Sequence, residues 1–211
     1  MMFKYVIFDV DGTILDTEQA ILKSLQKVLK EEGKDYEQED LRFALGIPGD
    51  VTLKRLGIPD IERVSPKWSH TVLEFSQEVH IFNGLKDVIE AISASPIRTG
   101  IVTSKTKQEV IDEFEPFGIS NHFECIICAT DTENHKPHPE PLLVCLERMK
   151  AIKDETIYIG DSIYDMQCAK SAGVKFALAL WGSKSIEGFE SADFILKEPT
   201  DILELINISK S

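Results

Sequence analysis

The sequence has 211 residues, of which 43% are hydrophobic and 28% are charged, a composition typical of a globular protein and not of a disordered or fibrous one. Its 23 Lys and Arg residues stand against 36 Asp and Glu residues, so the formal net charge is −13 at pH 7. This excess of acid argues against nucleic acid and against an anionic membrane as partners, because both require a basic surface. The carboxylates either form a solvated surface or include a group that binds a metal.

The remaining bulk features predict a cytoplasmic protein. Residues 1–9 lack the apolar segment and the cleavage site of a signal peptide, and no apolar run approaches the roughly 20 residues that span a bilayer. Four cysteines are too few for a disulfide scaffold in a chain of this length. Cys125 and Cys128 lie in an apolar run that predicts a strand, where residues three apart face opposite sides. We therefore expect core cysteines and not half of a zinc site.

Short apolar runs alternate with amphipathic patterns along most of the chain. The runs are rich in Ile, Val and Phe without polar alternation, which is typical of strands covered on both faces. They predict strands at residues 4–10, 99–103, 125–129, 156–159, 176–180 and 193–196. Apolar residues spaced three and four apart predict helices at residues 85–94, 107–117, 140–150, 164–172 and 200–206. This alternation predicts an α/β fold with a doubly wound, Rossmann-like parallel sheet.

One segment, from residue 17 to about residue 80, contains helical patterns and no convincing strand. An apolar stripe that begins at Ile21 ends at Gly33, a residue type common just past the end of a helix. Ser65 followed by Pro66 predicts another helix start, with Ser65 as the N-cap and the proline as the first helical residue. We therefore predict a core formed by residues 1–16 and 81–211 with an all-helical insert at residues 17–80.

The first predicted strand ends in two carboxylates, Asp9 and Asp11, which Gly12 and Thr13 follow. In an open α/β sheet, ligands bind at the carboxyl ends of strands, so both acids lie where chemistry is expected. Gly12 permits a tight turn and a close approach of the backbone to a ligand. By itself the pattern is also compatible with an Asx-type turn that leaves a strand.

Other predicted strands are also followed by polar groups. Thr103 and Ser104 supply hydroxyls that could bind an anion or cap a helix. Lys136 is a cation in a proline-rich loop and could be a surface lysine. Asp161 and Asp165 follow the fourth strand and could complement a helix dipole. The order of these groups and their shared position at strand ends favour a single functional site.

In this order the four groups resemble the motifs of the haloacid dehalogenase-like superfamily, and specifically of its phosphatases with an inserted helical cap, of the phosphoglycolate phosphatase type. The motifs are Asp9-x-Asp11-Gly12-Thr13, Thr103, Lys136 before Pro137, and Gly160-Asp161-x-x-x-Asp165. The resemblance covers nearly the whole chain and implies that residues 17–80 are the cap.

The resemblance implies a phosphatase that hydrolyses a small phosphate monoester through an aspartyl-phosphate intermediate. Asp9 would be the nucleophile, and a carboxylate is competent for this attack on phosphorus. Asp11 would be the general acid and then the general base, while Thr103 and Lys136 would hold the phosphoryl oxygens. Gly12, Thr13 and Ser104 complete the implied substrate-binding set.

The resemblance also implies Mg²⁺ as the cofactor. A divalent cation offsets the repulsion between a carboxylate nucleophile and an anionic substrate. A site of carboxylates, carbonyls and water without clustered His or Cys suits this ion. The implied ligands are Asp9, the backbone carbonyl of Asp11, Asp161 and, directly or through a water, Asp165.

Two positions narrow the implied activity. Dehalogenases and phosphonatases of the family carry other residues at the position of Asp11, so phosphate esters are favoured. The family's phosphoglucomutases carry His twelve residues past the nucleophile, where this chain has Ile21, so we expect hydrolysis. The alternatives are a phosphomutase, an inorganic pyrophosphatase, a nucleotidase or a sugar-phosphate phosphatase of the same family, or a catalytically idle binding module.

We expect the substrate to be a small phosphorylated metabolite and the chain to be a monomer or a weak dimer. Four cations of the predicted cap could meet a second anionic group of the substrate or form a solvated face: Arg42, Lys54, Arg55 and Lys67. The glycines of Gly46-Ile47-Pro48-Gly49 could form a substrate loop or a turn between helices.

Overall fold

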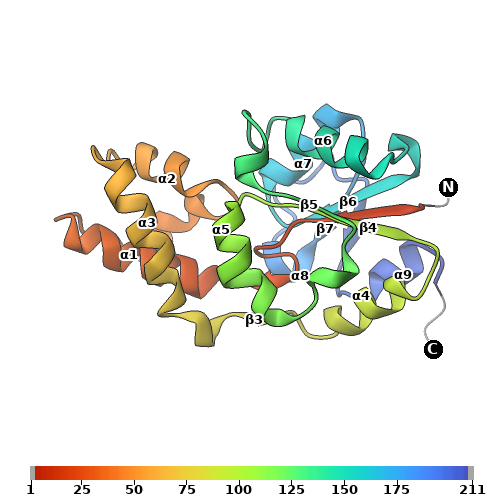
Figure 1. Ribbon diagram of the computed structural model, residues 1–211, viewed down its shortest axis with the longest axis horizontal. Coiled ribbons are helices and arrows are strands. Elements are labelled where there is room, and N and C mark those ends of the chain that lie inside the picture. The colour runs from red at the N-terminus through yellow and green to blue at the C-terminus, as the bar shows by residue number, and fades with distance from the viewer. Residues whose placement is uncertain (1–2, 209–211) are drawn as a thin grey trace.

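The computed structural model describes residues 3–208, and a six-stranded parallel sheet lies at its centre (Figure 1). The strand order is β5-β4-β1-β6-β7-β8, so β4 and β5 lie on one side of β1 and the later strands on the other. The strands are β1 (Tyr5–Phe8), β4 (Arg98–Val102), β5 (Cys125–Ile127), β6 (Thr156–Gly160), β7 (Lys175–Ala179) and β8 (Phe194–Leu196). The six predicted strands and the α/β fold are confirmed.

Helices cover both faces of the sheet and bury its apolar side chains. They are α4 (Leu85–Ser93) and α9 (Asp201–Leu205) on one face, and α6 (Glu140–Met149) and α7 (Ile163–Ala172) on the other. Ile7 and Phe8 are adjacent in β1 and therefore point to opposite faces. Phe8 packs with the α4 and α9 cluster, Ile7 packs with the α6 and α7 cluster, and both are fully buried. This double burial explains the absence of polar alternation in the strands.

The connections contain several short turns of helix. The segment predicted as one helix at residues 107–117 consists of α5 (Lys107–Glu109), a π-helical turn η3 (Val110–Phe114) and a 3₁₀ turn η4 (Glu115–Phe117). Another short helix, α8 (Leu180–Ser183), begins at Leu180, which the sequence predicts as the end of a strand. The remaining 3₁₀ turns of the core are η5 (Ser120–His122), η6 (Ala129–Asp131) and η7 (Lys153–Glu155).

The helical segment is joined to the core by a two-stranded antiparallel ribbon that the sequence analysis missed. The ribbon consists of β2 (Leu15–Asp16) and β3 (His80–Ile81). Between its strands lie α1 (Glu18–Glu31), η1 (Gln38–Ala44), α2 (Gly49–Arg55), α3 (Ile61–Leu73) and η2 (Ser76–Glu78). These helices lie to the left of the sheet in Figure 1 and enclose a hydrophobic cluster of their own, which includes Leu25, Leu53 and Trp68. Gly33 follows the end of α1 with φ +74°, as predicted.

The predicted helix start at Ser65 and Pro66 is wrong. α3 begins at Ile61, and the Asp60 side chain caps it by accepting a hydrogen bond from the Arg63 backbone N–H at 3.2 Å. Pro66 therefore lies inside the helix, where it cannot donate a backbone hydrogen bond. Asp and Ser are both favourable N-cap residues, so local preference alone did not distinguish the two starts.

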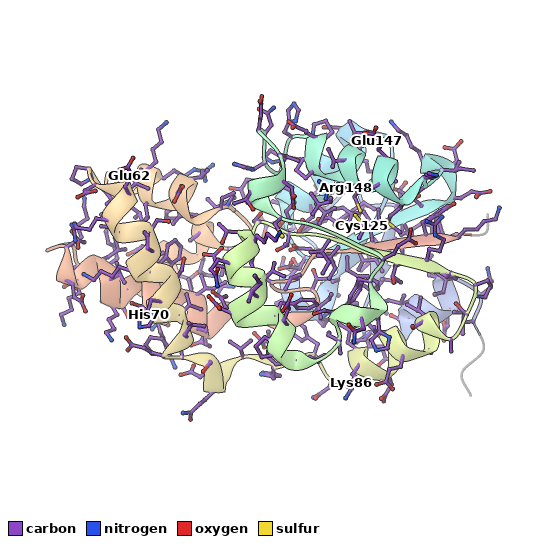
Figure 2. All side chains as sticks on the ribbon, in the orientation of Figure 1. Glu62, His70, Lys86, Cys125, Glu147 and Arg148 are labelled. Atoms are coloured by element: carbon purple, nitrogen blue, oxygen red, sulfur yellow. The ribbon has the colours of Figure 1, made fainter. Side chains whose placement is uncertain are left out.

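Most charged side chains form the outer surface. Glu62, Lys86 and Glu147 are exposed on helices of both parts of the chain (Figure 2). Cys128 is buried and Cys125 half-buried, both as free thiols, and the one potential metal cluster among residues 3–208 contains no cysteine. Within that range, no helix combines the length and the apolar composition needed to cross a membrane.

Candidate active site

The carboxyl ends of neighbouring strands bring the predicted motifs to one edge of the sheet. Phe8 pairs in parallel register with residues of both β4 and β6. The Asp9 N–H donates to the Ile159 carbonyl at 2.9 Å, which extends the pairing of β1 and β6 by one residue. The strand order reverses here, at the position where open α/β sheets bind ligands. Asp9, Thr103 and Asp161 therefore lie at the same edge, as predicted.

Lys136 is buried at this edge. Its Nζ lies 2.9 Å from Asp9 Oδ1 and 2.7 Å from Asp165 Oδ1, and the residue is 4% exposed. Burial would lower the pKa of this lysine, but the two carboxylates outweigh burial and raise it. A buried ammonium requires such partners. The alternative of a surface lysine is therefore wrong.

The carboxyl groups around Lys136 are strongly perturbed. Burial raises the pKa of Asp9 to about 7, although the attraction of Lys136 opposes this shift. Burial, together with the charges of Asp165 and Asp9, raises the pKa of Asp161 well above its usual value. A bound cation would favour the charged form of each of these groups.

Asp9, Asp161 and Asp165 form the one cluster among residues 3–208 that could hold a metal ion, with one oxygen from each within 4.8 Å of the others. A ligand set of carboxylate oxygens suits Mg²⁺. Two glycines provide the space that these side chains occupy. A Cβ at Gly12 would lie 2.1 Å from Asp161 Oδ2, and a Cβ at Gly160 would lie 2.6 Å from Asp165 Cβ. The residues present therefore fit the predicted cofactor.

Tyr158 contacts the buried side chains of the site, and the sequence analysis did not predict it. Its hydroxyl lies 2.9 Å from Asp165 Oδ1 and 3.0 Å from the Val102 carbonyl, and the Lys136 Nζ lies 3.4 Å from it. The residue is fully buried on β6. One hydroxyl thus contacts three of the four motif regions. The sequence signal was a tyrosine hydroxyl in the apolar middle of the strand, because such a group needs a partner when buried.

Two predicted substrate-binding hydroxyls have partners within the protein. Thr13 Oγ1 donates to Asp161 Oδ1 at 3.1 Å, and the preceding Gly12 takes the left-handed φ of +76° that the turn requires. Ser104 Oγ donates to the Gly46 carbonyl at 3.1 Å. Because Gly46 belongs to the helical segment, Ser104 connects that segment to the core.

Asp11 has different neighbours from Asp9. Its Oδ1 lies 3.1 Å from Lys105 Nζ, and its side chain lies outside the metal cluster. Lys105 is a buried lysine that the sequence analysis did not select. It is the second residue after Thr103, so a strand-end motif could have suggested it.

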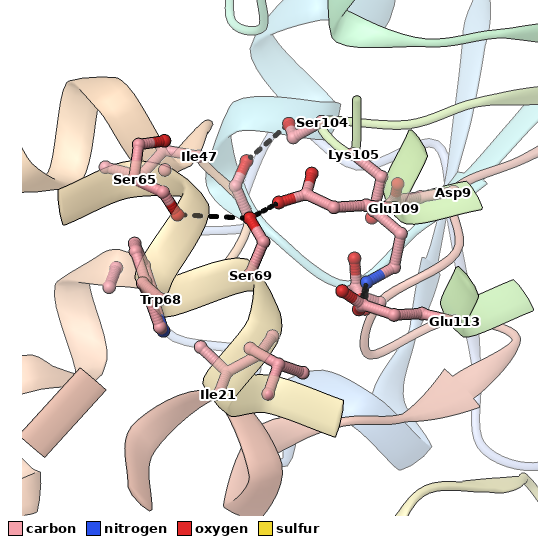
Figure 3. A pocket seen from close by; sticks show the side chains of 15 residues that line it. Asp9, Ile21, Ile47, Ser65, Trp68, Ser69, Ser104, Lys105, Glu109 and Glu113 are labelled. Atoms are coloured by element: carbon pink, nitrogen blue, oxygen red, sulfur yellow. Dashed lines mark hydrogen bonds and ion pairs between the residues drawn. The ribbon is translucent and has the colours of Figure 1, made fainter. Parts of the chain in front are cut away.

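A cavity separates the sheet edge from the helical segment. On the core side it is lined by Asp9, Asp11 and Lys105. Apolar residues line much of the opposite side: Ile21, Ala44, Ile47, Trp68 and Val72. Figure 3 shows Trp68 and Ile21 across the opening from Lys105 and Asp9. The 46–49 loop lines this cavity and connects η1 to α2, so it is both a cavity loop and a turn between helices.

Only one of the four predicted cap cations lines a cavity next to the site. Arg42 lines a second cavity, which also contacts Asp11, and it forms an ion pair with Glu18 at 2.8 Å. Lys184 of the core contacts the same Glu18 at 3.0 Å. Lys54, Arg55 and Lys67 line neither of these two cavities.

Comparison with known proteins identifies the family. A family model described as haloacid dehalogenase-like hydrolase matches residues 6–179. The chain belongs to this family. The predicted family is confirmed, and so is the predicted enzyme class, a hydrolase that acts on phosphate ester bonds.

Relatives of this haloacid dehalogenase-like hydrolase match almost its whole length. "Putative pyrophosphatase PpaX" of Caldanaerobacter subterraneus subsp. tengcongensis is 31% identical, over 98% of this chain and 96% of that protein. "Pyrophosphatase PpaX" of Halalkalibacterium halodurans is 28% identical, over 99% of each. Among solved structures, a "putative phosphoglycolate phosphatase" from Lactobacillus plantarum is 27% identical with a TM-score of 0.88, over 97% of this chain and 100% of that one.

Proposed function

We propose that this hydrolase removes the phosphoryl group of a small phosphorylated metabolite in the cytoplasm, through an aspartyl-phosphate intermediate on Asp9 and with Mg²⁺ as cofactor. The observation that supports this most directly is the buried arrangement of Lys136 between Asp9 and Asp165. A nucleophilic carboxylate, a fixed cation and further carboxylates that suit a divalent metal are the groups that phosphoryl transfer requires.

The proposed reaction has two displacements at phosphorus. A carboxylate oxygen of Asp9 forms a bond to phosphorus while the bond to the leaving oxygen breaks, and Asp11 gives its proton to that oxygen. Asp11 then accepts a proton from the water that attacks phosphorus, and the bond to Asp9 breaks. Mg²⁺, held by Asp9, Asp161, Asp165 and the Asp11 carbonyl, would supply positive charge against the phosphoryl oxygens.

Fixed groups of the protein would also stabilise the negative charge on the phosphoryl oxygens in the transition state. Lys136 is positioned by its two ion pairs, so it would meet developing negative charge without reorganisation. Thr103 is buried where β4 ends and would donate its hydroxyl to a phosphoryl oxygen. Thr13 orients Asp161 through the hydrogen bond between their side chains.

We further propose that residues 17–80 act as a cap on a core formed by residues 1–16 and 81–211. The helical segment faces the active-site cavity, and Ser69 on α3 donates to Glu109 on α5 at 2.6 Å. The β2–β3 ribbon joins this segment to the core. Closure of such a segment would exclude water from the reaction.

Two small phosphate compounds are the candidate substrates. The apolar wall of the cavity favours the less highly charged leaving group, so phosphoglycolate, the compound named for the Lactobacillus structure, is our first candidate. Pyrophosphate is the second, because the curated relatives are named as pyrophosphatases.

Turnover measurements test this proposal. The native protein should release phosphate from p-nitrophenyl phosphate and from at least one of the two candidates with Mg²⁺, and EDTA should stop the reaction. Asp9→Asn should abolish turnover while leaving the protein folded, whereas Asp154→Asn, at an exposed turn, should leave turnover unchanged. Turnover by Asp9→Asn would remove Asp9 as the nucleophile. Absence of metal-dependent turnover by the native protein on a broad panel of phosphometabolites would favour a binding module.

A further inference from the structure

Lys105 is a buried cation at the wall of the active-site cavity, and none of the four motifs includes it. Its Nζ lies 3.1 Å from Asp11 Oδ1 and 2.5 Å from Glu113 Oε2, and its side chain is 7% exposed. It is the only cation among the described residues that line this cavity. Figure 3 shows its amine facing Glu113 beside the opening.

The local backbone holds Lys105 in place. Its N–H donates to Thr103 Oγ1 at 3.2 Å, and its carbonyl accepts a hydrogen bond from the Ala129 N–H at 2.8 Å. The next residue, Thr106, caps α5 together with Glu109. Both sides of Lys105 are thus anchored, and its side chain extends from a rigid position.

Glu113 anchors the other end of this side chain. It lies in the π-helical turn that replaces the regular helix expected there, and π-helical turns occur frequently at functional sites. Burial raises the pKa of Glu113, although Lys105 opposes this shift. Both side chains are largely buried, so each charge gains from having the other as a partner.

Lys105 is the ion-pair partner of the Asp11 carboxyl group. Its Oδ1 is fully buried and has no hydrogen-bond partner within residues 3–208. Lys105 Nζ is close enough for an ion pair, yet the geometry does not form a hydrogen bond. Lys105 is therefore the cation placed closest to this oxygen in the ion pairs of residues 3–208.

We propose that Lys105, held by Glu113, is a positioning residue that orients the Asp11 carboxyl group for proton transfer to the leaving oxygen. The inference rests on the proposed function, in which Asp11 is the general acid. An acid must lie within hydrogen-bond reach of the atom that it protonates. A misplacement of about 1 Å can cost a reaction about 100-fold, so an unrestrained carboxyl group would transfer its proton poorly.

The test compares substrates whose leaving groups need different amounts of protonation. p-Nitrophenolate is a good leaving group without protonation. The glycolate alkoxide that leaves from phosphoglycolate is a poor one and requires a proton. Lys105→Gln should lower kcat/KM for phosphoglycolate by about tenfold or more while changing kcat/KM for p-nitrophenyl phosphate by less than about threefold. This parameter reports the first displacement, in which the leaving groups differ, and not the later hydrolysis that both substrates share. Glu113→Gln should give the same pattern. Lys107→Gln, at an exposed position on the same segment, should change neither rate.

If phosphoglycolate proves not to be a substrate, the alkyl phosphate that the native protein hydrolyses fastest takes its place in the comparison. Lys105→Arg keeps the positive charge and supplies the measurement should Lys105→Gln fail to fold. It should retain more alkyl phosphate turnover than Glu113→Gln does.

A double variant shows whether Lys105 acts through Asp11. Once Asp11→Asn has removed the acid, adding Lys105→Gln should lower kcat/KM for the alkyl phosphate by less than about twofold. Equal losses of kcat/KM on aryl and alkyl phosphates, or additive losses in the double variant, would overturn the inference and leave Lys105 as a structural ion-pair partner. The proposed function would instead fail if the native protein were inactive or if Asp9→Asn were active. The two kinds of failure are therefore distinguishable.

Discussion

Replacing Gly182 with alanine should disturb the active site from a position outside it. Gly182 lies on α8, beside Trp181, whose Nε1 donates to the Thr13 carbonyl at 3.0 Å. α8 therefore packs directly on the loop that follows β1. A Cβ at Gly182 would lie 1.6 Å from the carbonyl oxygen of Gly12 and 3.1 Å from Asp161 Cβ.

The size of the disturbance follows from these contacts. An ordinary contact of a Cβ begins at 3.4 Å, so the two backbones must separate by 3.4 − 1.6 = 1.8 Å along this line. Gly12 lies between Asp11 and Thr13, so the shift displaces the proposed acid and the residue that orients Asp161. A displacement of about 1 Å can lower a rate about 100-fold. Overpacking of this kind also costs about 1–3 kcal/mol of stability.

The assay is steady-state turnover of the best substrate, combined with urea unfolding. Gly182→Ala should lower kcat/KM by about 100-fold and the free energy of unfolding by about 1–3 kcal/mol. Gly118→Ala is the control, because Gly118 has a positive φ but no atom within 4 Å of the added Cβ. It should cost about 1–2 kcal/mol of stability and leave turnover unchanged. Native-like turnover and stability of Gly182→Ala would show that α8 does not restrain the loop.

Two further variants test the metal site and the ion pairs that Asp193 forms with Lys170 and Lys175. Asp161→Asn should raise the Mg²⁺ concentration needed for half-maximal turnover by about tenfold or more, and an unchanged titration would exclude Asp161 as a ligand. Burial works to raise the pKa of Asp193, but hydrogen bonds from Lys170 and Lys175 outweigh it and hold the pKa at about 2. This value lies below the unfolded pKa of about 3.9, so the stabilisation is present above about pH 4 and is lost as the pH falls towards about 2. The destabilisation caused by Asp193→Asn in urea unfolding should therefore shrink over that interval, and a difference independent of pH would contradict the assignment.

The parts of this molecule that could be predicted from sequence are those that local patterns encode. The apolar run before Asp9 indicates a buried parallel strand, and the position of Asp9 at its end follows from the chain direction alone. Lys136 could be predicted as a site residue because the motifs, taken together, resembled those of a family. The first inference uses residues close together in the sequence, and the second uses the order of short motifs along the chain.

The contacts that could not be predicted join residues far apart in the chain. Lys105 restrains Asp11 from another strand end, and Gly182 meets Gly12 from α8. Local preference also failed at α3, where Asp60 and Ser65 are both good caps and the surrounding packing selects the earlier start. In such cases tertiary contacts decide between locally similar alternatives.

The β2–β3 ribbon has a consequence for how this enzyme can diversify. Because Asp16 pairs with His80, the polypeptide enters and leaves the helical segment at adjacent points. An insertion whose ends meet can be lengthened, shortened or exchanged without moving the strand that carries Asp9. The separate hydrophobic cluster of the segment lets its sequence vary independently of the sheet. The helical segment and the strand ends that carry the site residues thus lie in stretches of chain that selection can alter one at a time.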